Sequence, residues 1–146
     1  MRTDRAGGAA GAPAVPPVTA HDLTGTWSLL SFHETDETGT AVQEGPLGPG
    51  PSGRLVYLPD GQVSVHMMRD PDAPAGTPFY MGYAGTWRLV DGATVAHRIA
   101  ITPRPDWVGT EQTRDLVLEG DRLTLHASTR IRGVLHHRAL VWQRVT

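Results

Sequence analysis

The stretch Gly53–Met68 (GRLVYLPDGQVSVHMM) decides the fold class, because it reads as two short β-strands joined by a tight turn. Apolar and β-branched side chains flank Pro59-Asp60-Gly61, three residues that favour a reversal of the chain. Similar short runs, each ended by turn residues such as Asp91-Gly92, recur along the chain, and no long helical periodicity interrupts them. The eight runs are Gly25–His33, Gly53–Leu58, Gln62–Met68, Tyr83–Val90, Thr94–Ile101, Glu111–Glu119, Arg122–Ser128 and His137–Val145.

Eight short runs separated by hairpin turns predict an all-β protein, folded as an antiparallel barrel or a sandwich. A chain of 146 residues is the size of one domain, which we place at residues 23–146. Residues 1–22 are mostly Gly, Ala and Pro without apolar periodicity. Because such a segment cannot bury enough apolar surface to offset its ordering entropy, we expect a disordered N-terminal tail.

The composition excludes several kinds of site. The chain has no cysteine, so disulfides, thiolate metal sites and cysteine nucleophiles are ruled out. A formal net charge of −2 provides no attraction to nucleic acid or to anionic membranes, and no apolar run approaches the roughly 20 residues of a membrane span. Adjacent His136 and His137 would face opposite sides of a strand, and the other histidines lack metal-ligand spacing. We therefore expect no metal, no cofactor, no nucleic-acid partner and no membrane association.

The N-terminus has arginines but no apolar segment of the secretory type. On this ground we expect a cytoplasmic location.

The hairpin within Gly53–Met68 leaves open which of its faces lines an interior. If Asp60-Gly61 is a two-residue turn, Tyr57 lies opposite Ser64. One face then carries Leu55, Tyr57, Ser64, His66 and Met68, and the other carries Val56, Leu58, Val63, Val65 and Met67. Both faces are partly apolar, so alternation alone does not choose between them.

Two later hairpins define a clearer inward face. A two-residue turn at Gly120-Asp121 pairs Leu116 with Leu125, and a three-residue loop over Asp91–Ala93 pairs Trp87 with His97. The predicted inward set is Val95, His97, Ile99, Ile101, Arg114, Leu116, Leu118, Leu123 and Leu125. A mostly apolar lining with a few isolated polar groups is typical of a small-molecule pocket.

Five segments carry a resemblance to a known family: GTWSLLSF from residue 25, GPLGPGPSGRLVYLPDGQVSVHMMR from residue 45, YAGTWRL from residue 83, PDWVGTEQTRDLVLEGDRLTL from residue 105 and LVWQRV from residue 140. Together they resemble the lipocalin-like domain family of bacteria and fungi, over residues 23–146. The resemblance implies a calycin-type, single antiparallel eight-stranded β-barrel around a hydrophobic ligand. It also implies that Arg144 of the last strand crosses the ring of Trp27, a structural contact.

Four residues are candidates for chemistry in such a lumen. Arg114 on the inward face would hold a carbonyl, enolate or carboxylate, and His97 beside it would transfer a proton. Tyr57 and His66 would form a second acid–base pair if their face of the hairpin is the lumen. The plain alternative is that these groups only satisfy hydrogen bonds inside a packed barrel.

A further set of side chains would bind or wrap the ligand, although clusters of this kind are more often plain core. The predicted ligand-binding residues are Ser64, Met68, Tyr83, Trp87, Ile99, Leu116, Leu125 and Trp107. For Trp107 the alternative is a structural plug at one end of the barrel.

Three functions remain open at this point. The first is a cofactor-independent enzyme of natural-product biosynthesis, which cyclises, isomerises or dehydrates a polyketide- or terpenoid-like metabolite. The resemblance implies this function, because genes of the family often lie among natural-product biosynthesis genes. The second is a carrier that binds the same small hydrophobic metabolite without chemistry. The third is an interaction module with a filled barrel. Association into a homodimer is left open.

Overall fold

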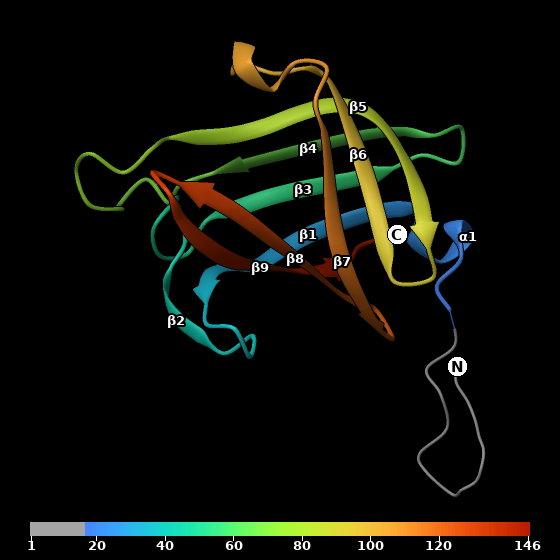
Figure 1. Cartoon of the computed structure of the whole chain (residues 1–146), viewed down its shortest axis with the longest axis horizontal. Helices are drawn as coiled ribbons and strands as arrows, with labels where there is room; N and C mark the ends of the chain where they lie inside the picture. Colours follow the sequence, from blue (N-terminus) through green and yellow to red (C-terminus); the bar gives the residue numbers. More distant parts are fainter. Residues whose placement is uncertain (1–16) are drawn as a thin grey trace, which may run out of the picture.

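The structure, a computed structural model, describes residues 17–146, which form β-strands and loops with almost no helix (Figure 1). Short antiparallel strands follow one another along the chain because turn residues separate them, as the sequence predicts. The elements in chain order are α1 (Ala20–Leu23), β1 (Gly25–Thr35), β2 (Ala41–Glu44), β3 (Ser52–Tyr57), β4 (Gln62–Met68), β5 (Tyr80–Asp91), β6 (Thr94–Ile101), the 3₁₀ turn η1 (Pro105–Trp107), β7 (Glu111–Glu119), β8 (Arg122–Ile131) and β9 (Val134–Arg144).

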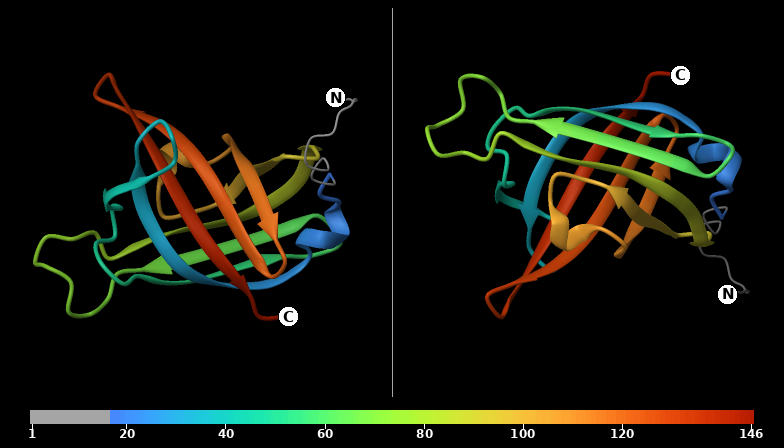
Figure 2. Two further views of the ribbon diagram at one scale, coloured as in Figure 1. Left: turned by 90° about the horizontal axis from the view of Figure 1, so that it is seen from below. Right: turned by 90° about the horizontal axis from the view of Figure 1, so that it is seen from above.

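Pairing between the first and last strands closes the sheet into a barrel (Figure 2). β1 pairs with β9 from Trp27↔Arg144 to Thr35↔His137, and with β3 at its N-terminal end. The eight strands β1 and β3–β9 therefore form the ring, which confirms the predicted antiparallel eight-stranded barrel. The short strand β2 beside the far end of β1 is not predicted by the sequence pattern, because its four residues are all exposed and show no apolar alternation.

Residues 17–22, predicted as part of a disordered tail, are ordered. The Val18 N–H donates to the Gly92 carbonyl at 3.1 Å, and Val18 packs against the core. Helix α1 follows and places Leu23, which is fully buried, against the barrel. The predicted boundary is wrong here because one valine and one turn of helix produce no recognisable periodicity. The predicted disorder of residues 1–16 lies outside the described residues.

The turn between β3 and β4 settles which face of that hairpin is inside. It has three residues, with Gly61 at a φ of 93°, so Tyr57 pairs with Val63 rather than with Ser64. A shift of one residue reverses every side chain of a strand. The predicted faces are therefore wrong: Leu55, Tyr57, Val63, Val65 and Met67 are buried, whereas Ser64, His66 and Met68 lie on the outer face.

The two later hairpins have the predicted register over most of their length. Leu116 pairs with Leu125, and Trp87 pairs with His97. Ile101 was expected inside, but its exposed fraction is 72%. A bulge beside Gly85 shifts the end of β6 by one residue. The backbone can approach this closely because Gly85 has no side chain, which would collide with the Arg98 carbonyl.

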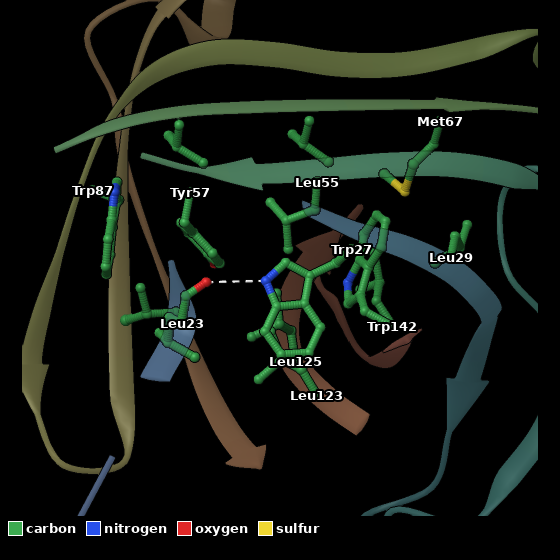
Figure 3. Close-up of a cluster of buried hydrophobic side chains, with 14 of the residues drawn as sticks. Leu23, Trp27, Leu29, Leu55, Tyr57, Met67, Trp87, Leu123, Leu125 and Trp142 are labelled. Carbon is green, nitrogen blue, oxygen red and sulfur yellow. Dashed lines mark hydrogen bonds between the residues drawn. The ribbon is translucent and has the colours of Figure 1, made fainter. Parts of the chain in front are cut away.

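The α1 end of the barrel is filled by large apolar side chains (Figure 3). Trp27 is fully buried at the centre, and its indole N–H donates to the Leu23 carbonyl at 3.0 Å. Leu55, Trp142 and Leu123 pack around it (Figure 3). This solid end leaves the space for a ligand to the opposite half of the barrel.

Candidate functional site

A cavity of about 460 Å³ occupies the half of the barrel away from α1. Its mouth is lined by Trp107 of η1, Glu111 at the start of β7 and Arg130 near the end of β8. The inner walls are largely apolar and include Phe32, Leu55, Val65, Met67, Leu125, Leu140 and Trp142. The polar lining includes Tyr83, His97, Gln112, Arg114 and Arg138. Apolar walls with a few polar groups are what the sequence predicts for this face.

A buried hydrogen-bonded chain of three side chains stands at one side of this cavity. The hydroxyl of Tyr57 lies 2.6 Å from Nε2 of His97, and the hydroxyl of Tyr83 lies 2.6 Å from Nδ1 of the same ring. Each residue comes from a different strand, β3, β6 or β5. His97 pairs with Trp87 across β5 and β6, and its imidazole faces the interior. In the observed register of β3 and β4, Tyr57 faces the interior as well, where it contacts this ring. We refer to Tyr57, His97 and Tyr83 as the relay.

Burial keeps all three groups of the relay uncharged. Desolvation, with a smaller effect of the charge on Arg114, lowers the pKa of His97 to about 3. Desolvation raises the pKa of Tyr83 to about 12 and that of Tyr57 well above its ordinary value. The relay is therefore neutral at physiological pH, and His97 is not poised to change charge there. Its two hydrogen bonds can still polarise each other, so a change at one tyrosine affects the hydrogen bond of the other.

Arg114 lies beside the relay, on the cavity wall, as predicted. Its guanidinium donates to the Gln112 side-chain oxygen and, at 3.0 Å, to the Thr113 carbonyl. Arg114 is only half-buried, and these oxygens accept two of its hydrogen bonds, so its charge is neither fully buried nor without partners. A guanidinium has five N–H donors, so donors remain for a ligand oxygen.

Trp142 contributes a buried donor that the sequence analysis does not single out. It lines the cavity with an exposed fraction of 1%, and its indole N–H has no hydrogen-bond acceptor within residues 17–146. A buried donor without an acceptor is costly, which makes it a candidate contact for a polar ligand atom. Leu140 and Trp142 are two residues apart in β9 and therefore share a face of the strand. This alternation is the signal in the sequence that could have identified Trp142 as inward-facing.

The predicted ligand-binding residues divide into three groups. Tyr83, Leu125 and Trp107 line the cavity. Trp87, Ile99 and Leu116 are buried but lie outside the lining, and the Trp87 indole N–H donates to the Leu58 carbonyl at 3.0 Å. Ser64 and Met68 do not face the lumen at all, because they belong to the outer face of β4.

His66 is also on the outer face, so it cannot pair with Tyr57. It bridges the hydroxyls of Ser64, at 3.0 Å, and Tyr80 at the edge of a shallow hollow of about 250 Å³. The rest of this hollow is formed by Ser52, Gly53, Arg54, Met67 and Met68. Within this surface hollow, His66 and Tyr80 are thus already hydrogen-bonded to each other, and Arg54 donates to the Ser28 hydroxyl at 2.9 Å.

A charged cluster at the cavity mouth escaped the sequence analysis. Glu34 of β1 is 9% exposed and accepts hydrogen bonds from Arg138 at 2.8 Å and His136 at 2.9 Å. Burial opposes ionisation of Glu34, but these two partners outweigh it, so its pKa is lowered. Arg138 lines the cavity, and its charge is matched by Glu34. Arg114 makes no such ion pair with a described residue.

Within residues 17–146, no three His, Cys, Asp or Glu side chains gather as metal ligands would. No helix in that same range is long and apolar enough to cross a membrane.

A model of the family described as "Lipocalin-like domain" matches residues 24–80 and 75–145. The chain belongs to this family. The match covers nearly all of the lipocalin-like barrel, so the resemblance inferred from the sequence motifs is confirmed. A search of curated proteins found no match. The lipocalin-like fold and its internal cavity are consistent with binding of a small hydrophobic ligand.

Proposed function

We propose that this lipocalin-like protein binds one small, mostly apolar metabolite in its cavity. The observation that carries the proposal is a space of about 460 Å³ with apolar walls and with polar groups gathered at Tyr83, His97 and Arg114. Ligand pockets have volumes of roughly 300–1,000 Å³ and this kind of lining. A ring-containing metabolite of polyketide or terpenoid type, with an oxygen at one end, fits both the size and the chemistry.

Binding can be followed through the protein's own fluorescence, because Trp107 and Trp142 line the cavity. We expect 2-acetylnaphthalene, an apolar two-ring ketone, to quench tryptophan emission with saturation at micromolar concentration. Ala127 is buried on the cavity wall, and Ala127→Phe should abolish saturation by filling the space. The matched control is Val117→Phe on the outer face of β7, where Val117 is exposed. Equal titration curves for the two variants would contradict binding in the lumen.

A second candidate function is cofactor-independent acid–base catalysis, such as isomerisation, dehydration or cyclisation of the bound metabolite. The relay supports it, because it connects a buried tyrosine through His97 to the cavity wall. In this proposal Arg114 and Tyr83 polarise a ligand carbonyl, which weakens a C–H bond on the adjacent carbon. The low pKa of His97 makes it a connector of hydrogen bonds rather than the base. In this proposal the carboxylate of Glu111, which also lines the cavity, accepts the proton from the carbon and later returns it.

Exchange of the methyl protons of 2-acetylnaphthalene in D₂O tests this chemistry by NMR without knowledge of the natural substrate. Exchange faster than in buffer, and reduced at least tenfold by Tyr83→Phe, would support catalysis. Saturable binding without accelerated exchange would favour the carrier function.

A further inference from the structure

The relay can be hydrogen-bonded in two directions, and burial decides between them. A neutral imidazole has one N–H donor and one acceptor nitrogen. In one arrangement Tyr57 donates to Nε2 of His97, and the Nδ1–H group of His97 donates to Tyr83. In the reverse arrangement Tyr83 donates to Nδ1, and Nε2–H donates to Tyr57.

The reverse arrangement leaves the hydroxyl proton of Tyr57 without an acceptor. Tyr57 is fully buried, is not part of the cavity lining and has His97 as its one side-chain hydrogen-bond partner among the described residues. A buried donor without an acceptor is strongly disfavoured. Tyr83 differs, because it lines the cavity and its hydroxyl proton can reach a molecule held there.

From this geometry we infer that the relay runs from Tyr57 through His97 to Tyr83, so that Tyr83 directs its hydroxyl proton into the cavity and selects ligands with a carbonyl or carboxylate oxygen. The inference rests on the proposed ligand binding and specifies the chemistry of the ligand's polar end. Tyr57 acts as a positioning residue, which sets the direction of a hydrogen bond at a site that it does not line.

Two other cavity groups agree with a ligand that accepts hydrogen bonds. The indole N–H of Trp142 has no acceptor in the described part of the chain, and an indole nitrogen can only donate. The guanidinium of Arg114 likewise can only donate, and the Gln112 oxygen nearby is already used by it. Tyr83, Trp142 and Arg114 all belong to the lining of this cavity, and each carries an O–H or N–H donor.

The direction of the relay can be measured without any ligand. In a long-range ¹H–¹⁵N spectrum of protein labelled at histidine, the His97 ring should be neutral at pH 7 with its proton on Nδ1. The His97→Gln variant identifies its signals by their loss. A proton on Nε2 would overturn the inference, whatever the protein binds.

Matched probes test the consequence for binding. Wild type should bind 2-acetylnaphthalene about tenfold more tightly than 2-ethylnaphthalene, which has the same rings and no oxygen. Tyr83→Phe should remove this preference and leave the affinity for 2-ethylnaphthalene unchanged. Tyr57→Phe should weaken it, because Nε2 loses its donor and no hydrogen bond then fixes the His97 proton on Nδ1.

The outcomes separate this inference from the proposed function. If neither naphthalene binds to wild type, the proposed function fails, and the histidine spectrum still decides the direction of the relay. Equal affinity of wild type for the two probes would overturn the inference while leaving lumen binding intact. A variant that is merely misfolded would lose both probes together, and the spectrum of wild type then remains the deciding result.

Discussion

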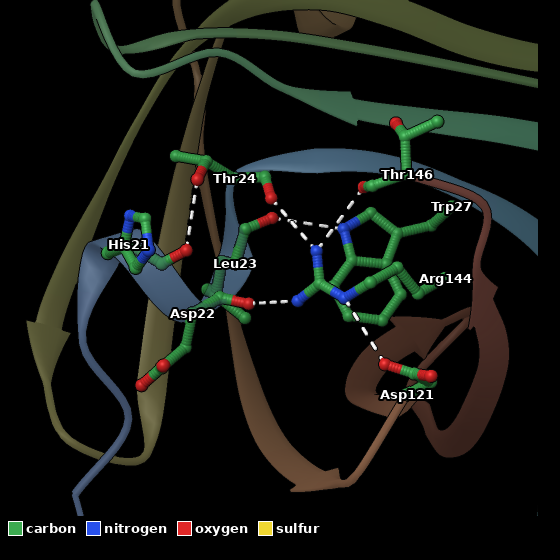
Figure 4. Close-up of polar contacts among 8 residues, drawn as sticks. All are labelled: His21, Asp22, Leu23, Thr24, Trp27, Asp121, Arg144 and Thr146. Atoms are coloured by element: carbon green, nitrogen blue, oxygen red, sulfur yellow. Dashed lines mark hydrogen bonds and ion pairs between the residues drawn. The ribbon is translucent and has the colours of Figure 1, made fainter.

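The guanidinium of Arg144 lies across the indole ring of Trp27, with its central carbon 4.2 Å from the ring centroid (Figure 4). Arg144 donates to the Thr24 carbonyl at 3.0 Å and to the Asp22 carbonyl, which ties the last strand to the residues before β1. The ring below donates in turn to Leu23 at 3.0 Å. One side chain of β9 thus joins the end of the barrel, helix α1 and the central tryptophan. The contact of Arg144 with Trp27 is the one that the family resemblance implies.

Trp27→Ala should reduce the free energy of unfolding by roughly 3–5 kcal/mol, because it removes a fully buried aromatic side chain. Arg144→Ala should cost less, since a cation–π contact contributes ~0.5–2 kcal/mol. Urea denaturation of both variants and the double variant gives the coupling between them. We expect the double variant to lose less than the sum of the two; full additivity would show that the contact in Figure 4 contributes nothing.

Deletion of residues 1–20 should lower the melting temperature. It removes Val18, which bonds to Gly92 and packs on the core, and the first residue of α1. We expect a loss on the order of 1 kcal/mol, as for a lost hydrogen bond with some buried apolar surface. Deletion of residues 1–16 is the matched control, and its composition predicts no change. Identical melting curves for the two truncated proteins would show that Val18 does not stabilise the barrel.

The strand order and most of the registers follow from short-range signals in the sequence. Turn residues such as Gly120-Asp121 mark where strands end, and alternation marks the buried face, so the β7–β8 hairpin is predicted correctly. The predicted register of the hairpin at Pro59–Gly61 is wrong for a local reason. Whether its turn has two or three residues depends on the backbone conformation at Gly61. Each face there carries enough apolar residues that the pattern does not reveal the error.

The site is less predictable, because its key contacts join residues far apart in the chain. The sequence places His97 and Arg114 on the inward face correctly. The relay depends on Tyr57, which lies 40 residues from His97, and only the closed barrel brings them within 2.6 Å. The ion pair of Glu34 with Arg138, 104 residues away, requires closure between the first and last strands.

Acidification below about pH 6.5 should destabilise the protein through His97. Its pKa is about 3 in the folded state because of burial, against an ordinary value near 6.5 in the unfolded chain. Between these values the unfolded state binds a proton that the folded state excludes, so the contribution of His97 is complete above pH 6.5 and decreases as the pH falls toward 3. The slope approaches about 1.4 kcal/mol per pH unit.

Unfolding free energies of wild type and His97→Phe, measured between pH 7 and pH 4.5, isolate this effect. The phenylalanine variant should be less stable at pH 7 but show a flatter profile, because it has no imidazole to protonate on unfolding. Because the pKa of Glu34 is lowered, its stabilising contribution is complete above the ordinary carboxylate value and is lost only below it. Parallel profiles for the two proteins would contradict a buried neutral His97.

Arg114→Met tests how the cavity recognises charge. The side chain is half-buried and makes no ion pair with a described residue, so its replacement should change the free energy of unfolding by less than about 0.5 kcal/mol. We expect the affinity for 2-naphthoate, a carboxylate, to decrease about tenfold, because a charge-assisted hydrogen bond at the cavity wall is lost. The affinity for the neutral 2-ethylnaphthalene should be unchanged. Arg98→Met is the control, since exposed Arg98 lies on the outside of β6 and its loss changes the net charge equally. If both variants weaken 2-naphthoate binding to the same extent, the general charge of the protein accounts for the effect, and Arg114 has no direct contact with the ligand.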